Sequence, residues 1–293
     1  MSGTATVLAP AKLTLSLRVT GVRPDGYHLL ESEMVALDLA DTLVIEGATA
    51  GPGGPDAAAG GVLSIDPHPD GPWTDRGPDP IPLGPENLVN RALVAVDRSA
   101  SVRIVKRVPP GAGLGGGSAD AAAILRWAGC ADRELAAALG ADVPFCVTGG
   151  RAMVRGVGEL VSPLPYEERW FTLLVVPFGV DTGAVYRTWD RLAAPGAPPA
   201  SEESTNDLEV AALMVEPRLG RWRDHLEGLT GRRAHLAGSG STWFVEGSTE
   251  ELGLADGQSL SAGDQSDAGD GVAAHAGEEG AVLVSVRTIP PMA

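Results

Sequence analysis

A glycine-rich run, PPGAGLGGGSADAAAILRWAG from Pro109 to Gly129, constrains this chain more than any other stretch. Alternating apolar residues such as Val102 and Ile104 precede it and predict a strand, and the Ala-rich segment within it predicts a helix. The five glycines between Gly111 and Gly117 lack Cβ atoms, so a bound group can approach the backbone closely. The unpaired N–H groups of the following helix would face that group, with the positive end of the helix dipole behind them. The run therefore predicts a loop that cradles phosphate.

The residues of this loop and of the helix start are the candidate phosphate contacts. We expect such contacts from Pro110, Gly111, Ala112, Gly113, Leu114, Gly115, Gly116, Gly117 and Ser118. Ser118 and Asp120 fall at the predicted start of the helix, where both side chains would cap it and both would reach a metal ion or a phosphate. A tight connection without a ligand is the alternative for any glycine run.

Composition limits the partners of the chain. Its 293 residues are enough for one large domain or two modest ones, and 22 Lys and Arg against 38 Asp and Glu give a formal net charge of −16. This charge argues against nucleic acid or an anionic membrane as a partner. Cys130 and Cys146 have no metal-ligand spacing, which fits a reducing compartment. With no leader-like or membrane-length apolar segment, we expect a cytoplasmic protein.

The first part of the chain predicts strands. Val7–Val19 alternates apolar and polar residues, which is typical of a half-buried strand, and this alternation places Lys12 and Thr14 on one face. Local sequence alone favours an exposed edge charge for that lysine over a functional group. The apolar residues of 35–45 predict two further strands, separated by Ala40-Asp41.

The rest of the chain alternates regular segments with irregular ones. Residues 47–85 are rich in Gly, Pro and Asp and predict a surface excursion with one short apolar piece, in which we place no chemistry. Residues 206–229 predict one helical segment. Residues 248–280 are acidic and rich in Gly and Ser, which predicts a flexible insertion, and residues 281–286 predict a final strand.

Two short segments carry further candidate functional side chains. The turn Arg23–Gly26 leads directly into Tyr27 and His28, which would stack on and hydrogen-bond a planar base, or would be a core tyrosine and a surface histidine. Asp142 lies two residues before Pro144, so a helix N-cap is the alternative to a chemical role. Local sequence leaves both choices open.

Two common glycine motifs do not fit the loop. A Walker loop needs a lysine before its Ser or Thr, and here Gly117 is followed directly by Ser118. The glycines of 111–116 match the bare dinucleotide-binding pattern, and Asp132 lies within its acidic window. The N-terminal half, however, predicts strands and loops rather than repeated βα units. A nicotinamide-dependent oxidoreductase is therefore a weak alternative.

Separated segments of the chain resemble, in order, the motifs of the GHMP kinase superfamily. Its three motifs are matched by APAK at 9–12, PPGAGLG at 109–115 with the serine behind it, and LAGSGS at 236–241. Within that superfamily, the signature of the 4-diphosphocytidyl-2-C-methyl-D-erythritol kinase family resembles RPDGYHLLESEMVALDLADTL, GLGGGSADAA, LGADVPF and NDLE at 206–209. The resemblance covers most of the chain except residues 47–84 and the acidic insertion.

The resemblance implies an α+β kinase of two lobes with the active site in the cleft between them. A ribosomal-protein-S5-like, ATP-binding lobe would span residues 1–160, and a ferredoxin-like lobe would span 161–293, interrupted by the acidic insertion near 248–280. The implied cofactors are ATP and Mg²⁺, the metal being carried with ATP and within reach of the Ser118 side chain. The protein would be a monomer or a weak homodimer.

The implied reaction moves the γ-phosphoryl group of ATP to the 2-hydroxyl of a cytidine-diphosphate-linked alcohol, in the methylerythritol phosphate route to isoprenoids. Asp142 matches the base of the family, and Lys12 matches its active-site lysine. The lysine would keep the carboxylate ionised, orient the hydroxyl and offset charge on the incoming phosphoryl group. The family usually has Asn where this chain has Thr14, which keeps a hydroxyl but loses the separate donor and acceptor of the amide.

The same resemblance implies residues for the base end of the acceptor. Tyr27 and His28 match the pair that holds the cytosine, the ring by stacking and the imidazole region by hydrogen bonds. Tyr186 falls where a second stacking aromatic is expected, and Thr182 falls near the substrate hydroxyls. Base–aromatic stacking contributes about 1–3 kcal/mol per base, so this pair would act mainly on binding.

Two other functions share the glycine-rich loop. Another small-molecule kinase of the superfamily would act on homoserine, mevalonate or a sugar, but the segment 23–28 favours a nucleotide-linked acceptor. A non-catalytic ATP-binding relative is the second, and Lys12, Asp142 and Ser118 argue against it, whereas Thr14 leaves a small opening.

Overall fold

The computed structural model describes residues 3–50, 62–67, 81–193, 204–261 and 280–292. Within these residues the chain forms two compact units. The first contains Met1–Pro110, Leu114–Glu168 and Thr288–Ala293, and the second contains Gly111–Gly113 and Arg169–Arg287. The glycine-rich loop is thus divided between them, its first three residues packing with the second unit.

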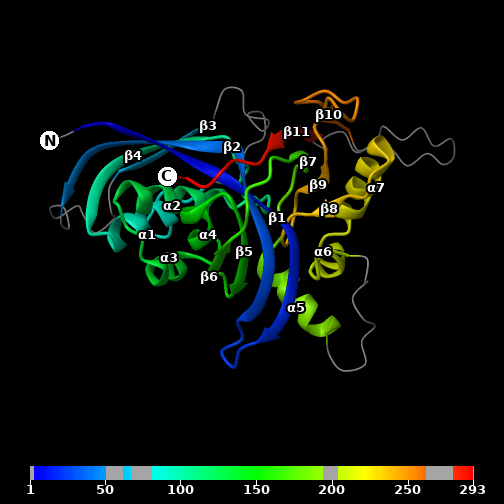
Figure 1. Ribbon diagram of the computed structural model, residues 1–293, viewed down its shortest axis with the longest axis horizontal. Helices are drawn as coiled ribbons and strands as arrows, with labels where there is room; N and C mark the ends of the chain where they lie inside the picture. The colour runs from blue at the N-terminus through cyan, green and yellow to red at the C-terminus, as the bar shows by residue number, and fades with distance from the viewer. Residues whose placement is uncertain (1–2, 51–61, 68–80, 194–203, 262–279, 293) are drawn as a thin grey trace. The chain divides into compact units, whose positions relative to one another are not determined.

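The first unit is built on a six-stranded sheet (Figure 1). Its strands are β1 (Ala5–Val22), β2 (His28–Ala50), β3 (Leu63–Pro67), β4 (Arg98–Lys106), β5 (Arg151–Gly156) and β6 (Leu160–Pro163). They follow the order β3-β4-β2-β5-β6, and β1 pairs antiparallel with β2. The apolar piece inside the predicted excursion is β3, which pairs parallel with β4. The remainder of that excursion, 51–61 and 68–80, lies outside the described residues.

The predicted break in the strands at Ala40-Asp41 is wrong, because β2 continues through it as a single strand. Asp41 is fully buried, which the sequence pattern disfavours inside a sheet. Its Oδ1 accepts hydrogen bonds from the backbone N–H groups of Arg107 (2.6 Å) and Val108 (2.8 Å). Because its polar oxygens are paired, the strand does not need to turn outward to solvate this side chain.

Four helices cover one face of this sheet: α1 (Leu88–Ala95), α2 (Gly116–Trp127), α3 (Arg133–Leu139) and α4 (Val143–Thr148) (Figure 1). The buried side of α2 consists largely of alanines, and Ala119, Ala121, Ala122 and Ala123 are fully buried. Small side chains let the helix backbone approach the sheet closely. Asn87 and Asp132 cap α1 and α3 through their side chains. The packing of α2 fixes where the glycine-rich loop must end.

The second unit holds a five-stranded sheet of order β10-β11-β7-β9-β8. Its strands are β7 (Trp170–Val175), β8 (His235–Leu236), β9 (Trp243–Glu246), β10 (Ser259–Leu260) and β11 (Ala281–Arg287), and its helices are α5 (Thr182–Leu192), α6 (Glu209–Val215) and α7 (Arg218–Thr230). The single helix predicted over 206–229 is therefore two, interrupted at Pro217, which cannot donate to the preceding turn. Of the predicted flexible insertion, 248–261 form turns and β10, and 262–279 lie outside the described residues.

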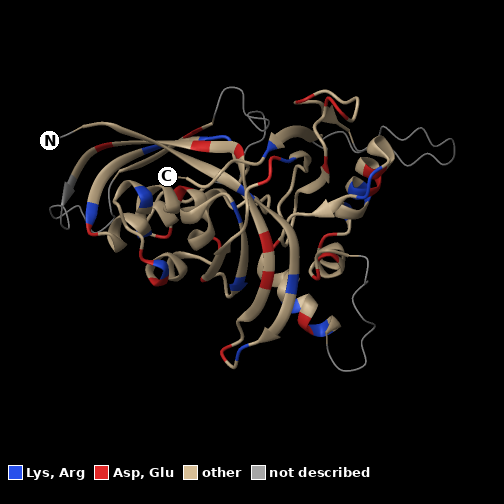
Figure 2. Cartoon of the chain, viewed as in Figure 1, with Lys and Arg blue, Asp and Glu red and all other residues tan. Residues whose placement is uncertain are grey.

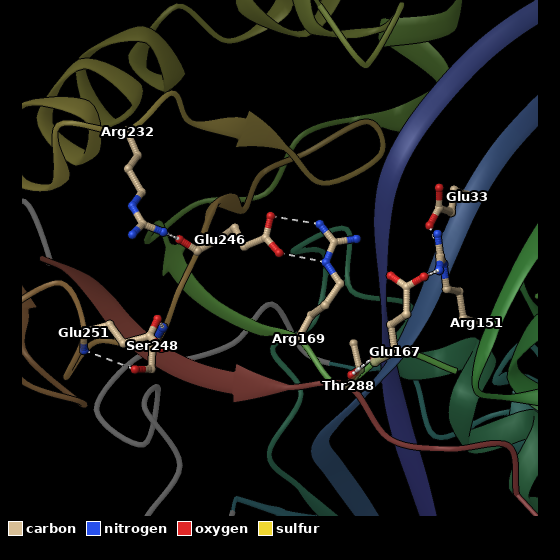
Figure 3. Close-up of polar contacts among 9 residues, drawn as sticks. All are labelled: Glu33, Arg151, Glu167, Arg169, Arg232, Glu246, Ser248, Glu251 and Thr288. Atoms are coloured by element: carbon tan, nitrogen blue, oxygen red, sulfur yellow. Dashed lines mark hydrogen bonds and ion pairs between the residues drawn. The ribbon is translucent and has the colours of Figure 1, made fainter. Parts of the chain in front are cut away.

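Charged residues are mixed rather than segregated on the elements seen in Figure 2, where both signs occur along the β1–β2 pair and along α7. Figure 3 shows one ion-pair group in each unit. In the first, Arg151 contacts Glu33 and Glu167. In the second, Arg169 makes a two-bond contact with Glu246. Among the described helices, none has the length and apolarity needed to cross a membrane.

Candidate active site

The helix α2 begins at Gly116, directly after the glycine-rich loop. Its N-cap residue is Gly115, whose φ of 70° lies in the left-handed region that glycine adopts without steric cost. Ser118 and Asp120 lie inside the first two turns, so the prediction that they cap the helix is wrong. The first N–H groups of α2 have no acceptor within the helix and are available to an anion.

Lys12 lies against this helix start. Its backbone N–H donates to the Leu114 carbonyl (3.0 Å), which ties the middle of β1 to the loop. A Cβ atom on Gly115 would lie 2.7 Å from the Lys12 Cγ, so only glycine lets the lysine stem pass. Lys12 is 5% exposed, which makes the edge-charge interpretation wrong. Its Nζ donates to the Thr14 Oγ1 (3.1 Å), as the predicted common face requires.

Asp142 faces the same ammonium group. Its Oδ2 lies 3.4 Å from the Lys12 Nζ, and its side chain is 29% exposed. Asp142 occupies the N-cap position of α4, but its side chain makes no capping hydrogen bond. Helix capping therefore does not occupy this carboxylate. Lys12 lies on β1 and Asp142 precedes α4, so the two residues are far apart in sequence and only the tertiary fold brings them together.

The α4 helix also buries a thiol beside this pair. Cys146 lies one turn after Asp142, and its N–H donates to the Asp142 carbonyl (3.0 Å). Burial, reinforced by the nearby Asp142 charge, raises the pKa of the Cys146 thiol to about 12. The thiol is therefore protonated at neutral pH and acts as a small apolar side chain. Asp142 is left as the ionisable partner of the lysine.

Within the second unit, the first residues of the glycine-rich loop pack on the segment 237–242. The Thr242 N–H donates to the Ala112 carbonyl (3.2 Å). A Cβ atom on Gly113 would lie 2.5 Å from the Ala237 carbonyl oxygen. Asn206 holds the same segment, because its Nδ2 donates to the carbonyls of Leu236 (2.9 Å) and Gly238 (2.7 Å). The buried amide thus fixes the third motif that the resemblance identified.

Tyr27 and His28 follow the tight turn that the sequence predicts. The turn is closed by the Gly26 N–H, which donates to the Arg23 carbonyl (2.9 Å). The Arg23 N–H in turn donates to the Tyr27 carbonyl (2.8 Å). Tyr27 is 64% exposed, so it is not the core tyrosine of the alternative interpretation. His28 pairs with Val22 at the end of the β1–β2 pairing. Val22 lies ten residues after Lys12 on β1, so the register places His28 away from the contact between Lys12 and Asp142.

The two further acceptor residues that the resemblance implies lie together on α5 of the second unit. Thr182 is the first residue of the helix, and its Oγ1 lies 2.8 Å from the Ser239 Oγ, so the two hydroxyls share a hydrogen bond. Tyr186 lies one turn later and is half-buried. The Thr182 side chain thus contacts the third motif directly.

A second lysine cluster, which the sequence analysis missed, lies behind the helix start. Lys106, at the end of β4, pairs with Asp41 of β2 and with Asp120 of α2, whose Oδ2 lies 3.0 Å from its Nζ. A Cβ atom on Gly116 would lie 3.2 Å from that Nζ. The sequence held two signals for this cluster: Asp41 lies inside an apolar strand pattern, and Lys106 ends a strand. The spacing between these two residues matches no recognisable motif.

Burial controls the charges of this cluster. It raises the pKa of Asp120 to about 7, and the Lys106 charge opposes that rise only in part. The Asp120 Oδ1 is buried and has no hydrogen-bond partner among the described residues. Burial alone would lower the pKa of Lys106, but the two carboxylates outweigh it and raise that pKa. The cluster therefore keeps its lysine charged in a site closed to solvent.

Known proteins match this chain at two levels: a family model matches the region of the loop, and relatives match most of the chain. The family model described as GHMP kinases N terminal domain matches residues 87–150, which contain the loop, α2 and Asp142. Within the described residues, His, Cys, Asp and Glu side chains do not gather in groups of three or more that would hold a metal ion.

Two relatives are similar to the chain over most of its length, and both are named 4-diphosphocytidyl-2-C-methyl-D-erythritol kinase. The protein of Paracoccus denitrificans (strain Pd 1222) is 38% identical over 250 residues, 80% of this chain and 84% of its own length. The protein of Cereibacter sphaeroides (strain ATCC 17029 / ATH 2.4.9) is 34% identical over 279 residues, 87% of this chain and 93% of its own length.

Solved structures extend the comparison. A crystal structure of 4-(cytidine 5'-diphospho)-2C-methyl-D-erythritol kinase superposes with a TM-score of 0.59 at 32% identity, covering 82% of this chain and 89% of its own. The L. major mevalonate kinase in complex with R-mevalonate superposes with a TM-score of 0.55 at 11% identity, covering 86% of this chain and 89% of its own. At that identity the second likeness extends to the fold alone.

Proposed function

The chain belongs to the family of 4-diphosphocytidyl-2-C-methyl-D-erythritol kinases, and on that premise we propose that it transfers the γ-phosphoryl group of ATP to the 2-hydroxyl of 4-diphosphocytidyl-2-C-methyl-D-erythritol. Membership confirms the predicted GHMP kinase fold with mixed helices and strands. The observation that carries the reaction is the contact of Lys12 with Thr14 and Asp142 beside the start of α2.

The glycine-rich loop fits the phosphates of a nucleotide. Gly115 leaves room for the lysine stem where any Cβ atom would collide with it. The open N–H groups at the start of α2 are donors for phosphate oxygens, and the helix dipole favours their negative charge. In a chain of net charge −16, these amides and Lys12 supply the local positive potential that ATP needs.

The reaction requires one bond to form, one to break and one proton to move. The acceptor hydroxyl oxygen bonds to the γ-phosphorus, the bond from that phosphorus to the β,γ-bridging oxygen breaks, and ADP leaves. Asp142 accepts the hydroxyl proton, because its carboxylate is partly exposed and is not used as a cap. Lys12 orients the hydroxyl and offsets charge on the phosphoryl group in flight. Thr14 holds that ammonium group through its hydroxyl.

Mg²⁺ is expected with the nucleotide rather than at a protein site of its own. When bound, it neutralises charge on the phosphate oxygens. Ser118, in the first turn of α2, is the side chain of the loop with an oxygen to offer it. The chain's own contribution is to orient the phosphates through its amides.

The acceptor is proposed to bind by its base at the Tyr27 end of the β1–β2 pairing. An exposed aromatic ring on a backbone fixed by a tight turn is suited to stack on cytosine. An extended acceptor has a base at one end and the reacting hydroxyl at the other. It suits a tyrosine at the end of the β1–β2 pairing and a lysine in the middle of β1. Thr182 and Tyr186 are proposed to contact the same acceptor.

The test is an ADP-release assay with Mg²⁺ and ATP. We expect turnover with the cytidine-diphosphate-linked alcohol and at least a hundredfold lower kcat/KM with homoserine or mevalonate, measured against ATP hydrolysis without acceptor. Comparable kcat/KM for a simple alcohol would point to another kinase of the superfamily. ATP binding without turnover of any alcohol would point to a non-catalytic relative, and binding of NADH instead of ATP to an oxidoreductase.

Other features stay predictions. These are the S5-like and ferredoxin-like topologies of the lobes, the lobe boundary near residue 160, the cytoplasmic location, and the monomeric or weakly dimeric state.

A further inference from the structure

The buried cluster around Lys106 has no part in the reaction proposed above, yet it lies next to the loop that the reaction uses. Lys106 ends β4, three residues before the first proline of the glycine-rich loop, and it is 6% exposed. A charged side chain is seldom buried to this degree unless it is paired. Its place between the sheet and α2 calls for an explanation.

The cluster ties together the segments on both sides of the loop. On the entry side, the Asp41 Oδ1 accepts the N–H groups of Arg107 and Val108, the two residues that lead into the prolines. On the exit side, Asp120 projects from the second turn of α2. Lys106 contacts both carboxylates, so one ammonium group joins the chain before the loop to the helix after it.

The ammonium group also lies directly behind the first residue of α2. A Cβ atom on Gly116 would be 3.2 Å from the Lys106 Nζ and 3.1 Å from the Val108 Cγ1. The absence of a side chain at Gly116 thus lets the lysine and the loop entry support the helix start from inside. On the outer side, the same helix start offers its open N–H groups.

Stability alone is a weak reason for this arrangement. Replacing a buried ion cluster by apolar residues of similar volume is often neutral or stabilising, because desolvation offsets the attraction. One oxygen of Asp120 even lacks a hydrogen-bond partner among the described residues. The hydrogen bonds of Lys106, by contrast, are directional. They hold β2, the end of β4 and α2 in one arrangement more specifically than nonpolar packing would.

We propose that Lys106 is a positioning residue for the nucleotide: its contacts with Asp41 and Asp120 hold the two ends of the glycine-rich loop so that the first N–H groups of α2 point at the phosphates. The inference rests on the proposed use of ATP. Because Lys106 is buried, it acts through the backbone of the loop. Its loss should therefore weaken ATP binding while the acceptor site and the chemistry remain.

The test uses the full-length protein with the double variant Lys106→Met/Asp120→Asn. This pair removes the ammonium group and one carboxylate, and it leaves Asp41 with its two backbone donors, so an isolated buried lysine is avoided. The single variant Asp120→Asn, which keeps the Lys106–Asp41 contact, serves if the double variant does not fold. The matched control is Arg151→Met, which removes a partly buried ion-pair group of the same unit.

Three quantities are measured: the KM for ATP, the KM for the acceptor with kcat, and hydrogen exchange of the amides of residues 109–118. We expect the KM for ATP to rise at least tenfold in the double variant, and about threefold in Asp120→Asn. The KM for the acceptor and kcat should stay within threefold. Exchange at 109–118 should become faster in both variants and stay unchanged in Arg151→Met.

An unchanged KM for ATP in a folded variant would overturn the inference, as would equal effects in Arg151→Met. If the wild-type protein binds ATP but phosphorylates no acceptor, the proposed function fails, and the dissociation constant for ATP replaces KM as the measure of positioning. If the wild-type protein binds no ATP, the inference fails with it, whatever the exchange of the loop.

Discussion

Two lysines lie against adjacent glycines at the start of α2, Lys12 beside Gly115 and Lys106 behind Gly116. Each lysine contacts at least one aspartate carboxylate, but the solvent exposure of these carboxylates differs. The partner of Lys12 is Asp142, whose side chain is 29% exposed, together with one hydroxyl. The partners of Lys106 are two aspartates with side chains 0% and 5% exposed. The same residue types thus form a partly exposed pair in one case and a buried cluster in the other, so solvent access and not composition distinguishes the two.

The largest effect should come from the open pair. Asp142→Asn should lower kcat by about 10²- to 10⁴-fold, the usual range for a general base, because an amide cannot accept the hydroxyl proton. Binding of ATP and acceptor should remain, as measured by calorimetry. Asp132→Asn is the control, since Asp132 also precedes a helix but caps it through its side chain. Near-normal turnover in Asp142→Asn would remove the distinction between the open and sealed pairs.

Removing Asp41 from the sealed cluster should lower stability. Asp41→Ala leaves the N–H groups of Arg107 and Val108 without their acceptor and removes one partner of a buried lysine. Breaking a buried pair in this way typically costs about 3–5 kcal/mol in the free energy of unfolding. The exposed pair Arg155–Glu31 is the control, and Glu31→Ala should cost at most about 1 kcal/mol. Urea denaturation measures both. Equal costs would contradict the sealed character of the cluster.

A smaller effect is expected from the hydroxyl of the open pair. Thr14→Val keeps the shape of the side chain but removes the acceptor that holds the Lys12 ammonium group. A hydrogen bond to a charged group contributes about 1.5–3 kcal/mol, so kcat/KM for the acceptor should fall about ten- to hundredfold. Thr14→Ser keeps the hydroxyl and should retain activity within about threefold. If both variants lose activity equally, the methyl packing and not the hydroxyl orients the lysine.

A further effect is a pH dependence of stability from the sealed cluster. Burial raises the pKa of Asp120 to about 7, against 3.8 for the ordinary side chain. Between these two values the folded state binds more protons at this group than the unfolded state does. Its contribution to stability is therefore fully present below about pH 4 and is lost as the pH rises through 7. Asp120→Asn should remove this component. Urea denaturation at pH 5 and pH 8 checks it, and parallel losses in both proteins would exclude Asp120 as the source.

The sequence predicted the fold well where a pattern is local. The alternation of β1 indicated that Lys12 and Thr14 share a face, and the structure confirms it with a 3.1 Å contact. The prediction of a loop leading directly into a helix is also confirmed, although the helix begins at Gly116 rather than at a capping side chain. Such features depend on residues near in sequence, so they can be worked out before the chain is folded.

Predictions from the sequence were wrong where a polar side chain has its partner far away in the sequence. An aspartate in the middle of a strand predicts a break, and β2 has none because Asp41 finds two backbone donors 66 and 67 residues away. For the same reason Asp120, predicted as a cap, is a buried partner of Lys106. No spacing in the sequence encodes these partners, and only the packed sheet and helix supply them.

By itself the sequence determined the glycine-rich loop, the turn before Tyr27 and the motif set that identifies the family, because glycines, prolines and short motifs act over a few residues. Only the tertiary structure decided which carboxylate meets which lysine. Asp142 keeps contact with solvent and Asp41 does not, and that difference in burial comes from the elements packed around each side chain. Burial depends on the whole fold, and it separates the pair suited to react from the cluster suited to support.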